Sequence, residues 1–286
     1  MRAPDFWQSR GAAARLLAPL GRLYGASVAW KARRARPFDP RVPVICVGNL
    51  TAGGSGKTPV AIAIAHALMA RGHKPFFLTR GYGGSEKGPA LAARVHSAAR
   101  MGDEALLLTR TAPTIVSRAR AAGAALAAGP LREPVAQGLA RADAVILVGD
   151  GDPDLQGYRG PVLRAHLAHE GHAFAGQSVF AFAGIGRPEK FVSSLQDSGA
   201  NVVGSCFFAD HHPYKRGEIE QLKAVAGNAL LVTTEKDFVR LSVQDREGLR
   251  IFKIAAQFQD AAALNRLLDS IPLDLSRDAS LAAGPP

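Results

Sequence analysis

Short apolar runs alternate with amphipathic stretches along most of this 286-residue chain. Short runs bounded by glycine, proline or charged residues predict buried strands, and apolar residues recurring every three or four positions predict helices. The predicted strands cover residues 42–47, 75–79, 114–117, 144–148, 179–183, 201–208, 229–233 and 251–255. The predicted helices cover residues 60–70, 105–109, 121–128, 218–226 and 260–268, with one more through Phe191 and Leu195.

This alternation of strands and helices predicts an α/β fold. Residues 42–155 are expected to form a doubly wound parallel sheet, as in kinases with a phosphate-binding loop. A second, smaller α/β domain is expected over residues 177–272. Residues 156–176 are predicted to be a linker, and residues 273–286 a frayed tail.

A glycine-rich segment between the first predicted strand and its helix has the composition of a phosphate-binding loop. Its glycines let backbone N–H groups turn toward an anion, and the helix that follows adds its positive end. Lys57 can then reach the outer phosphates, and the Thr58 hydroxyl can ligate Mg²⁺. The first position departs from the strict pattern, which requires glycine, and a plain strand-to-helix turn is the alternative. The segment consists of Thr51, Ala52, Gly53, Gly54, Ser55, Gly56, Lys57 and Thr58.

Positive charge is concentrated in the N-terminal segment of this chain, whose formal net charge is +11. Residues 1–41 contain nine Lys and Arg residues against Asp5 and Asp39. One helical stripe there is apolar and aromatic, which predicts an amphipathic helix on an anionic membrane surface. A helix packed on the protein, with solvated arginines, is the alternative. No nucleic-acid-binding module accompanies the basic segment. The stripe consists of Leu16, Leu20, Leu23, Tyr24 and Trp30.

Cysteine content and hydropathy narrow the class of protein. Cys46 and Cys206 lie in apolar runs in different halves of the chain, which argues against a disulfide scaffold and fits a reducing compartment. No apolar run is long enough to predict a spanning helix. The N-terminus lacks a clean apolar core, so a cleaved signal peptide is not predicted.

Seven short phrases, taken in order, resemble the tetraacyldisaccharide 4'-kinase family of the lipid A pathway. The resemblance extends from about residue 10 to residue 270 and is far more specific than the phosphate loop alone. The phrases are Gly-Asn-Leu at 48–50, Thr-Arg-Gly-Tyr-Gly-Gly at 79–84, Gly-Asp-Glu at 102–104, Ala-Gly-Pro-Leu-Arg-Glu-Pro at 128–134, Ala-Gly-Ile-Gly-Arg-Pro-Glu-Lys-Phe at 183–191, Ala-Asp-His-His-Pro-Tyr at 209–214 and Thr-Thr-Glu-Lys-Asp at 233–237.

The resemblance implies an ATP- and Mg²⁺-dependent kinase that phosphorylates an acylated glucosamine disaccharide 1-phosphate on its 4'-hydroxyl. It also implies a peripheral protein on the cytoplasmic face of the bacterial inner membrane. Asp103 resembles the family's catalytic base, and His211 resembles the histidine that partners it. An imidazole on that carboxylate would orient it and tune its proton affinity.

Each of these residues also has a simpler interpretation. Asp103 could be an ordinary acid at a helix N-terminus. His211 and His212 follow an apolar strand, where histidines also serve as capping residues or as metal ligands. Arg80 and Tyr82 lie on a glycine-flanked loop where α/β sheets bind ligands, or on a plain surface loop. The charges at residues 235–237 are interpreted as a salt-bridged helix start.

The resemblance is interrupted near Ala128 and Gly129. The family carries an additional segment there with an acidic pair that would hold Mg²⁺ through its water shell, followed by a strand. Asp150, after the predicted strand at 144–148, is at best a substitute for that pair. A degenerate protein that binds nucleotide and membrane without catalysis is therefore an alternative, and a phosphate-loop NTPase of another kind is a third.

Overall fold

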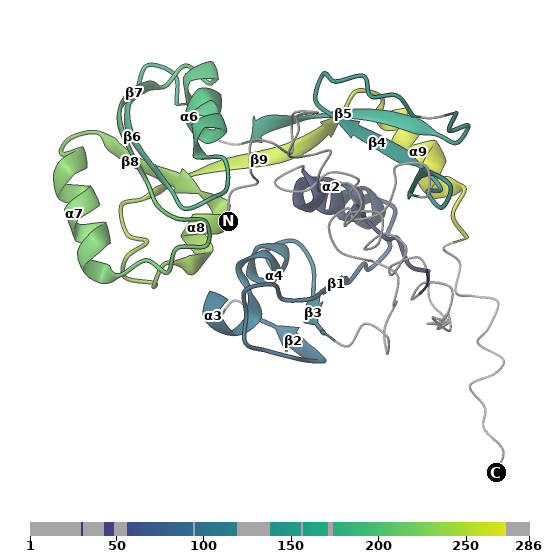
Figure 1. Cartoon of the computed structure of the whole chain (residues 1–286), viewed down its shortest axis with the longest axis horizontal. Helices are drawn as coiled ribbons and strands as arrows, with labels where there is room; N and C mark the ends of the chain where they lie inside the picture. Colours follow the sequence, from purple (N-terminus) through teal and green to yellow (C-terminus); the bar gives the residue numbers. More distant parts are fainter. Residues whose placement is uncertain are drawn as a thin grey trace, which may run out of the picture. The chain divides into compact units, whose positions relative to one another are not determined.

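The described chain divides into two compact units, and its helices and strands are labelled in Figure 1. The first is built from residues within Ala52–Ala119 and Leu167–Gln257, and the second from residues within Leu17–Thr51, Arg120–His166 and Phe258–Pro286. The computed structural model describes residue 30 and residues 43–48, 56–93, 95–118, 138–155, 157–170 and 174–272.

A helix and a small sheet open the first unit. Helix α2 (Lys57–Ala70) tolerates Pro59 because a proline in the first helical turn removes an N–H that has no helical partner. The sheet has the order β1-β3-β2, with β1 (Phe77–Thr79) parallel to β3 (Thr114–Val116) and β2 (Ala90–Ala92) antiparallel to it.

Two short helices cover one face of this sheet. Helix α3 (Ala98–Met101) and helix α4 (Asp103–Leu108) place Met101 and Ala105 against Val116, and all three side chains are fully buried. The sequence predicted β1 and β3 within two residues, but it predicted no strand where β2 lies. Burial of this cluster fixes where α4 begins.

The rest of the first unit is a parallel sheet with the order β9-β8-β6-β7. Its apolar strands have helices packed against them, as α/β folds require. Helix α6 carries Pro188 in its first turn, and the Thr234 side chain caps α8. The bounds are β6 (Ser178–Ala183), α6 (Pro188–Asp197), β7 (Asn201–Phe207), α7 (Arg216–Ala226), β8 (Leu230–Thr234), α8 (Glu235–Arg240) and β9 (Arg250–Phe258).

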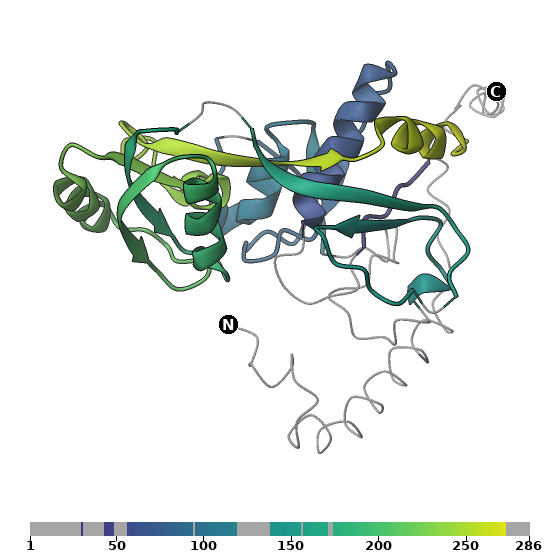
Figure 2. The same ribbon diagram turned by 90° about the horizontal axis from the view of Figure 1, so that it is seen from above.

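The second unit contains the parallel pair β4 (Val145–Val148) and β5 (Val162–Glu170), and helix α9 (Ala261–Asp269), which are visible in Figure 2. The Asp260 carboxylate caps α9 by accepting from the Ala263 N–H. Residues of β5 and α9 line a shared cavity. Strand β5 begins in the second unit and ends in the first, and strand β9 begins in the first unit and ends in the second.

Two expectations about local structure are wrong. Residues 43–48 form no strand, because no described strand pairs with them, and Val44 remains 52% exposed. The expected linker at 156–176 contains β5, whose backbone pairs with β4. The predicted N-terminal amphipathic helix, apart from Trp30, and the predicted helix at 121–128 lie outside the described residues. The fold is mixed α/β, with largely parallel strand pairing.

Candidate active site

Asp103 occupies the first position of α4, and the backbone before it requires glycine. Gly102 has φ 85°, a conformation that side chains disfavour. A Cβ on Gly102 would lie 2.6 Å from the carbonyl oxygen of Tyr82. The Asp103 side chain is 5% exposed, and its Oδ1 accepts the Glu104 N–H at 2.8 Å. The close approach of residues 81–84 therefore fixes the position of this carboxylate.

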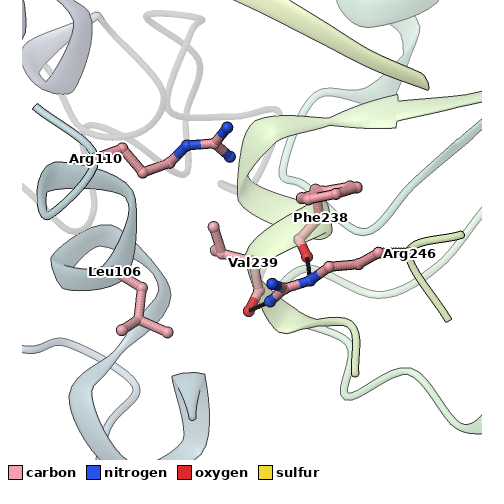
Figure 3. A pocket seen from close by; sticks show the side chains of 5 residues that line it. All are labelled: Leu106, Arg110, Phe238, Val239 and Arg246. Atoms are coloured by element: carbon pink, nitrogen blue, oxygen red, sulfur yellow. Dashed lines mark hydrogen bonds between the residues drawn. The ribbon is translucent and has the colours of Figure 1, made fainter. Parts of the chain in front are cut away.

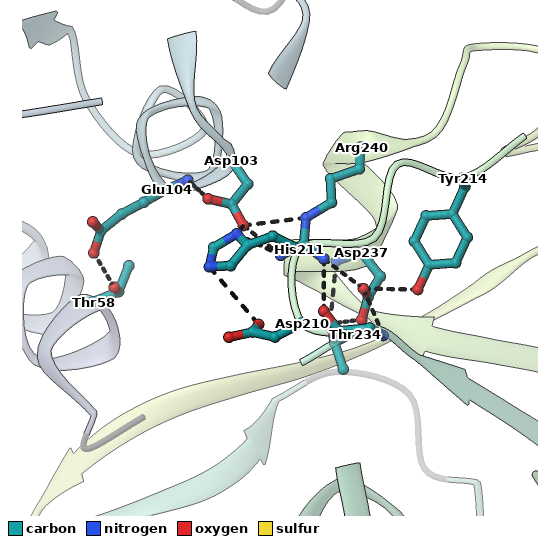
Figure 4. A network of polar contacts seen from close by, with 10 residues as sticks. Thr58, Asp103, Glu104, Asp210, His211, Tyr214, Thr234, Asp237 and Arg240 are labelled. Atoms are coloured by element: carbon teal, nitrogen blue, oxygen red, sulfur yellow. Dashed lines mark hydrogen bonds and ion pairs between the residues drawn. The ribbon is translucent and has the colours of Figure 1, made fainter. Parts of the chain in front are cut away.

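His211 reaches Asp103 from the loop that follows β7 (Figure 4). Its Nδ1 lies 3.1 Å from Asp103 Oδ2, although 108 positions separate the two residues in the sequence. Its backbone has φ 62°, which is unusual outside glycine, and its N–H donates to the Gly184 carbonyl at 3.0 Å. The structure thus brings the two predicted catalytic residues together in one site.

Electrostatics favour the charged forms of both side chains. Burial alone would raise the pKa of Asp103, but hydrogen bonds from His211 and Arg240 outweigh it and hold the pKa well below its usual range. The hydrogen bond to Asp103 raises the pKa of His211 against the opposing effect of burial. The Asp210 carboxylate, 3.8 Å from His211 Nε2, adds to this increase.

The sequence did not identify Arg240 or its partner Asp237 as part of this site. Arg240 ends α8, and its guanidinium contacts Asp103 Oδ2 through Nε at 3.2 Å and Nη2 at 2.5 Å. Its Nη1 donates to Asp237 Oδ1 at 2.9 Å. The predicted salt-bridged helix start holds for Asp237, but this pair is buried and continues to Asp103.

The described end of the phosphate loop lies close to Glu104. Gly56 precedes α2 with φ 84°, and the Thr58 hydroxyl donates to Glu104 Oε1 at 2.7 Å. Figure 4 shows Glu104 reaching toward Thr58 while Asp103 faces His211 and Arg240. The sequence analysis did not predict Glu104 as a site residue. The signal that could have identified it is its position next to Asp103. Residues Thr51, Ala52, Gly53, Gly54 and Ser55 lie outside the described residues.

The oxygen donors of Thr58 and Glu104 fit a magnesium ion. Mg²⁺ takes oxygen ligands and is bound in kinases by one or two carboxylates together with substrate phosphates. Within the described ranges, no group of three or more His, Cys, Asp or Glu side chains is arranged to hold a metal by itself. A metal here would therefore share its coordination between the protein and a nucleotide.

The other residues singled out by sequence have different surroundings. Tyr82 is 75% exposed, with its ring centroid 5.9 Å from that of His211, and Arg80 is exposed. His212 Nε2 lies 3.0 Å from Glu218 Oε2, at the N-terminus of α7. Asp150 is exposed beyond the end of β4 in the second unit. Of these, only Tyr82 contacts a residue of the Asp103 site.

A cavity of about 210 Å³ lies at the opposite end of α4 from Asp103 (Figure 3). It is lined by Leu106, Arg110, Phe238, Val239 and Arg246. The Arg246 guanidinium donates to the carbonyls of Phe238 and Val239 at 3.1 and 3.2 Å. This arginine therefore holds the backbone of α8 in place without contacting Asp103.

In the described part of the chain, no helix is both long and apolar enough to cross a bilayer.

Known proteins similar to this chain agree with the resemblance seen in the sequence. A protein 45% identical over 95% of this chain and 99% of its own length is the tetraacyldisaccharide 4'-kinase of Paramagnetospirillum magneticum. The corresponding protein of Rhodospirillum rubrum is 40% identical over 96% of this chain and 98% of its own length. The crystal structure of LpxK from Aquifex aeolicus in complex with ATP is 21% identical and has a similar fold, with a TM-score of 0.70 over 89% of this chain and 98% of that one.

The model of the family Tetraacyldisaccharide-1-P 4'-kinase matches residues 13–128 and 123–272. The two stretches overlap at residues 123–128, beside the interruption of the resemblance near Ala128 and Gly129, and the alignment with the first relative spans 321 positions, more than this chain contains. Nothing in these similarities favours the degenerate alternative. By its match over most of its length and its near full-length relatives, the chain belongs to the tetraacyldisaccharide-1-P 4'-kinase family.

Proposed function

We propose that this chain transfers the γ-phosphate of ATP to the 4'-hydroxyl of a tetraacyldisaccharide 1-phosphate. The observation that carries the proposal is the Asp103–His211 pair at 3.1 Å in a chain of this family. A base beside a phosphate-binding loop is what transfer to an alcohol needs, because the attacking hydroxyl must lose its proton.

The contacts of Asp103 assign a task to each of its carboxylate oxygens. Oδ2 is the acceptor for His211 and Arg240, whereas Oδ1 accepts only the Glu104 N–H among the contacts of the described residues. A carboxylate oxygen can accept more than one hydrogen bond, so Oδ1 keeps a lone pair for the substrate. The 4'-hydroxyl oxygen bonds to the γ-phosphorus while its proton moves to Asp103 Oδ1. The bond between the γ-phosphorus and ADP breaks in the same step, and ADP leaves.

The nucleotide is assigned to the loop Thr51 to Thr58, with Lys57 on the outer phosphates. Thr58 and Glu104 would hold Mg²⁺, which supplies positive charge to the transferring phosphoryl group. Their 2.7 Å separation supports this assignment, because one ion could contact both oxygens. The segment missing near Ala128 makes these two ligands more important here than in relatives that have it.

The lipid acceptor and the basic N-terminus together support a peripheral location on the cytoplasmic face of the inner membrane. A kinase whose substrate lies in a bilayer must work at its surface. Residues 1–41 combine cationic side chains with an apolar stripe, the composition of a helix that binds anionic lipid.

The test is transfer of labelled phosphate from ATP to a detergent-dispersed tetraacyldisaccharide 1-phosphate by the purified chain. We expect a lipid product phosphorylated at the 4'-position, and Mg²⁺ removal should abolish its formation. Nucleotide binding without product would identify the degenerate protein. ATP hydrolysis that does not depend on the glycolipid would identify an NTPase of another kind.

A further inference from the structure

We propose that the cavity between α4 and α8 binds a phosphate monoester with a small apolar organic group, held by Arg110 and Arg246. The cavity lies at the opposite end of α4 from Asp103. None of the described residues assigned to the kinase reaction is among its lining residues. The inference therefore goes beyond the proposed function and does not depend on it.

The first argument is the charge of the cavity lining. Arg110 directly follows α4, and Arg246 lies in the turns between α8 and β9. Figure 3 shows the two guanidinium groups extending into the space between α4 and α8 from its two sides. Among the described residues, no acidic side chain lines this cavity. A ligand that neutralises both guanidinium groups must therefore be an anion.

The second argument is that Arg246 is already held in position. Its Nε and Nη2 donate to the carbonyls of Phe238 and Val239 at 3.1 and 3.2 Å, and these two bonds do not use Nη1. Its guanidinium carbon also lies 5.1 Å from the centroid of the Phe238 ring, a cation–π contact. A ligand that binds a fixed guanidinium does not have to order it first, so binding costs less conformational entropy.

The third argument is the repulsion between the two arginines. Burial lowers the pKa of Arg246, and the positive charge of Arg110 lowers it further. Arginine nevertheless stays protonated in proteins, so both charges persist at working pH. Arg110 also lowers the pKa of Glu235, but that acid does not line the cavity. An anion between the two guanidinium groups would replace their repulsion by two attractions.

The fourth argument, from size and wall chemistry, identifies the class of anion. A phosphate monoester carries about two negative charges above its second pKa of about 6, and guanidinium groups bind phosphate through paired hydrogen bonds. A carboxylate would neutralise only one arginine. The remaining walls are apolar and are formed by Leu106, Phe238 and Val239. A cavity of about 150 Å³ holds a benzene ring, so 210 Å³ has room for a ring and part of a phosphate.

The experiment measures binding of phenyl phosphate to the full chain by titration calorimetry at about pH 8, where the probe is doubly charged. A saturating non-hydrolysable ATP analogue keeps the phosphate loop filled. We expect inorganic phosphate to bind about 10-fold more weakly, because it lacks the ring. Benzoate should bind about 10–100-fold more weakly, because it lacks one charge. No binding of phenyl phosphate would overturn the site, and equal binding of benzoate would overturn the ligand class.

Two variants locate the bound probe. Arg110→Gln and Arg246→Gln should each weaken phenyl phosphate binding about 10–100-fold, since each removes a charged hydrogen-bond donor. Arg110 is exposed and does not hold the α8 carbonyls, so its variant tests the site even if Arg246→Gln unfolds. Undiminished binding in Arg110→Gln would overturn the proposal.

Arg216→Gln is the matched control for loss of one positive charge. Arg216 lies on α7, its side chain is 78% exposed, and it does not line the cavity. Its affinity for phenyl phosphate should equal that of the unaltered chain. A loss equal to that of Arg110→Gln would show that net charge, rather than the cavity, attracts the probe, and would also overturn the proposal.

A crystal of the chain with the ATP analogue, soaked in phenyl phosphate, shows the position of the probe directly. We expect its phosphate between Arg110 and Arg246 and its ring against Leu106. Density for the probe only at other positions would refute the site. None of these measurements needs turnover, so a chain without kinase activity would refute the proposed function and leave this inference intact.

Discussion

At the scale of single residues, Asp103 is the side chain on which the proposed chemistry depends. We predict that Asp103→Asn lowers kcat by about 10²–10⁴-fold, because the amide cannot take the hydroxyl proton. ATP affinity should change little, since none of the described contacts of Asp103 involves Lys57 or Thr58. Steady-state kinetics and equilibrium nucleotide binding measure the two effects.

The control for Asp103→Asn is Glu86→Gln, which removes the charge from a partly exposed ion pair with Arg100 and keeps an oxygen that can accept the Lys87 and Gly88 N–H groups. Exposed pairs contribute little, so this variant should retain both stability and turnover. If Asp103→Asn kept most of its kcat, the proposed base would be wrong.

His211 should give stability a pH dependence of definite sign. The pKa of His211 is raised in the folded chain, so its contribution is fully present below the ordinary pKa of 6.5 and is lost as pH rises through the raised value. We predict that His211→Gln destabilises the chain more at about pH 6 than at about pH 9. Urea unfolding at both pH values measures this, and a larger loss at the higher pH would contradict it.

Sequence could identify Asp103 and His211 because each lies within a phrase that the family shares. Arg240 was not identifiable in this way, since 137 positions separate it from Asp103 and no local pattern links them. The charges at residues 235–237 predicted a salt-bridged helix start, but neither Arg240 as the partner of Asp237 nor the burial of the pair. Which charges a fold buries together depends on how α8 packs against α4, and that information is non-local.

At the scale of elements, the start of α4 depends on the glycine before Asp103. We predict that Gly102→Ala destabilises the chain by about 1–3 kcal/mol from backbone strain alone. A further loss arises because the new Cβ would contact the Tyr82 carbonyl at 2.6 Å. Displacement of Asp103 by about 1 Å should also lower kcat up to about 100-fold. Thermal unfolding and kinetics on the same preparation measure both.

Gly72→Ala is a control for the positive φ of the substituted glycine. Gly72 has φ 83°, close to the 85° of Gly102, but a Cβ there would meet nothing within 4 Å. It should lose some stability while kcat stays unchanged. Equal losses of activity in the two variants would show that the contact with Tyr82 has no special part in placing Asp103.

Elements with a clear apolar pattern were predictable, and those that depend on partners were not. The buried strand β6 and the amphipathic helix α9 follow their predicted ranges closely. Strand β5 contains His166, His169 and Glu170, so its composition resembles a loop, and its backbone pairing with β4 is what makes it a strand. Residues 43–48 have the opposite character: an apolar run without a described partner strand.

At the scale of the whole molecule, the uneven charge is expected to determine where the chain works. We predict that the full chain binds vesicles containing anionic phospholipid, and that raised salt weakens the binding through screening. Each Arg near an anionic surface contributes about 1 kcal/mol, so replacing Arg15 and Arg22 by Gln should weaken binding about 30-fold. Vesicle sedimentation across a lipid series measures this affinity.

The location of the charge, rather than its total, is what this prediction concerns. Arg216→Gln combined with Arg266→Gln removes the same charge from exposed positions elsewhere, with side chains 78% and 69% exposed. That control should bind vesicles like the unaltered chain, because the apolar faces of the helices that carry these arginines are already buried in the protein, at Ile219, Leu222, Leu264 and Leu268. Turnover of a soluble, short-chain acceptor should be equal in both double variants. Turnover of acceptor embedded in vesicles should fall only for the N-terminal one, and equal losses in both would contradict a membrane-binding N-terminus.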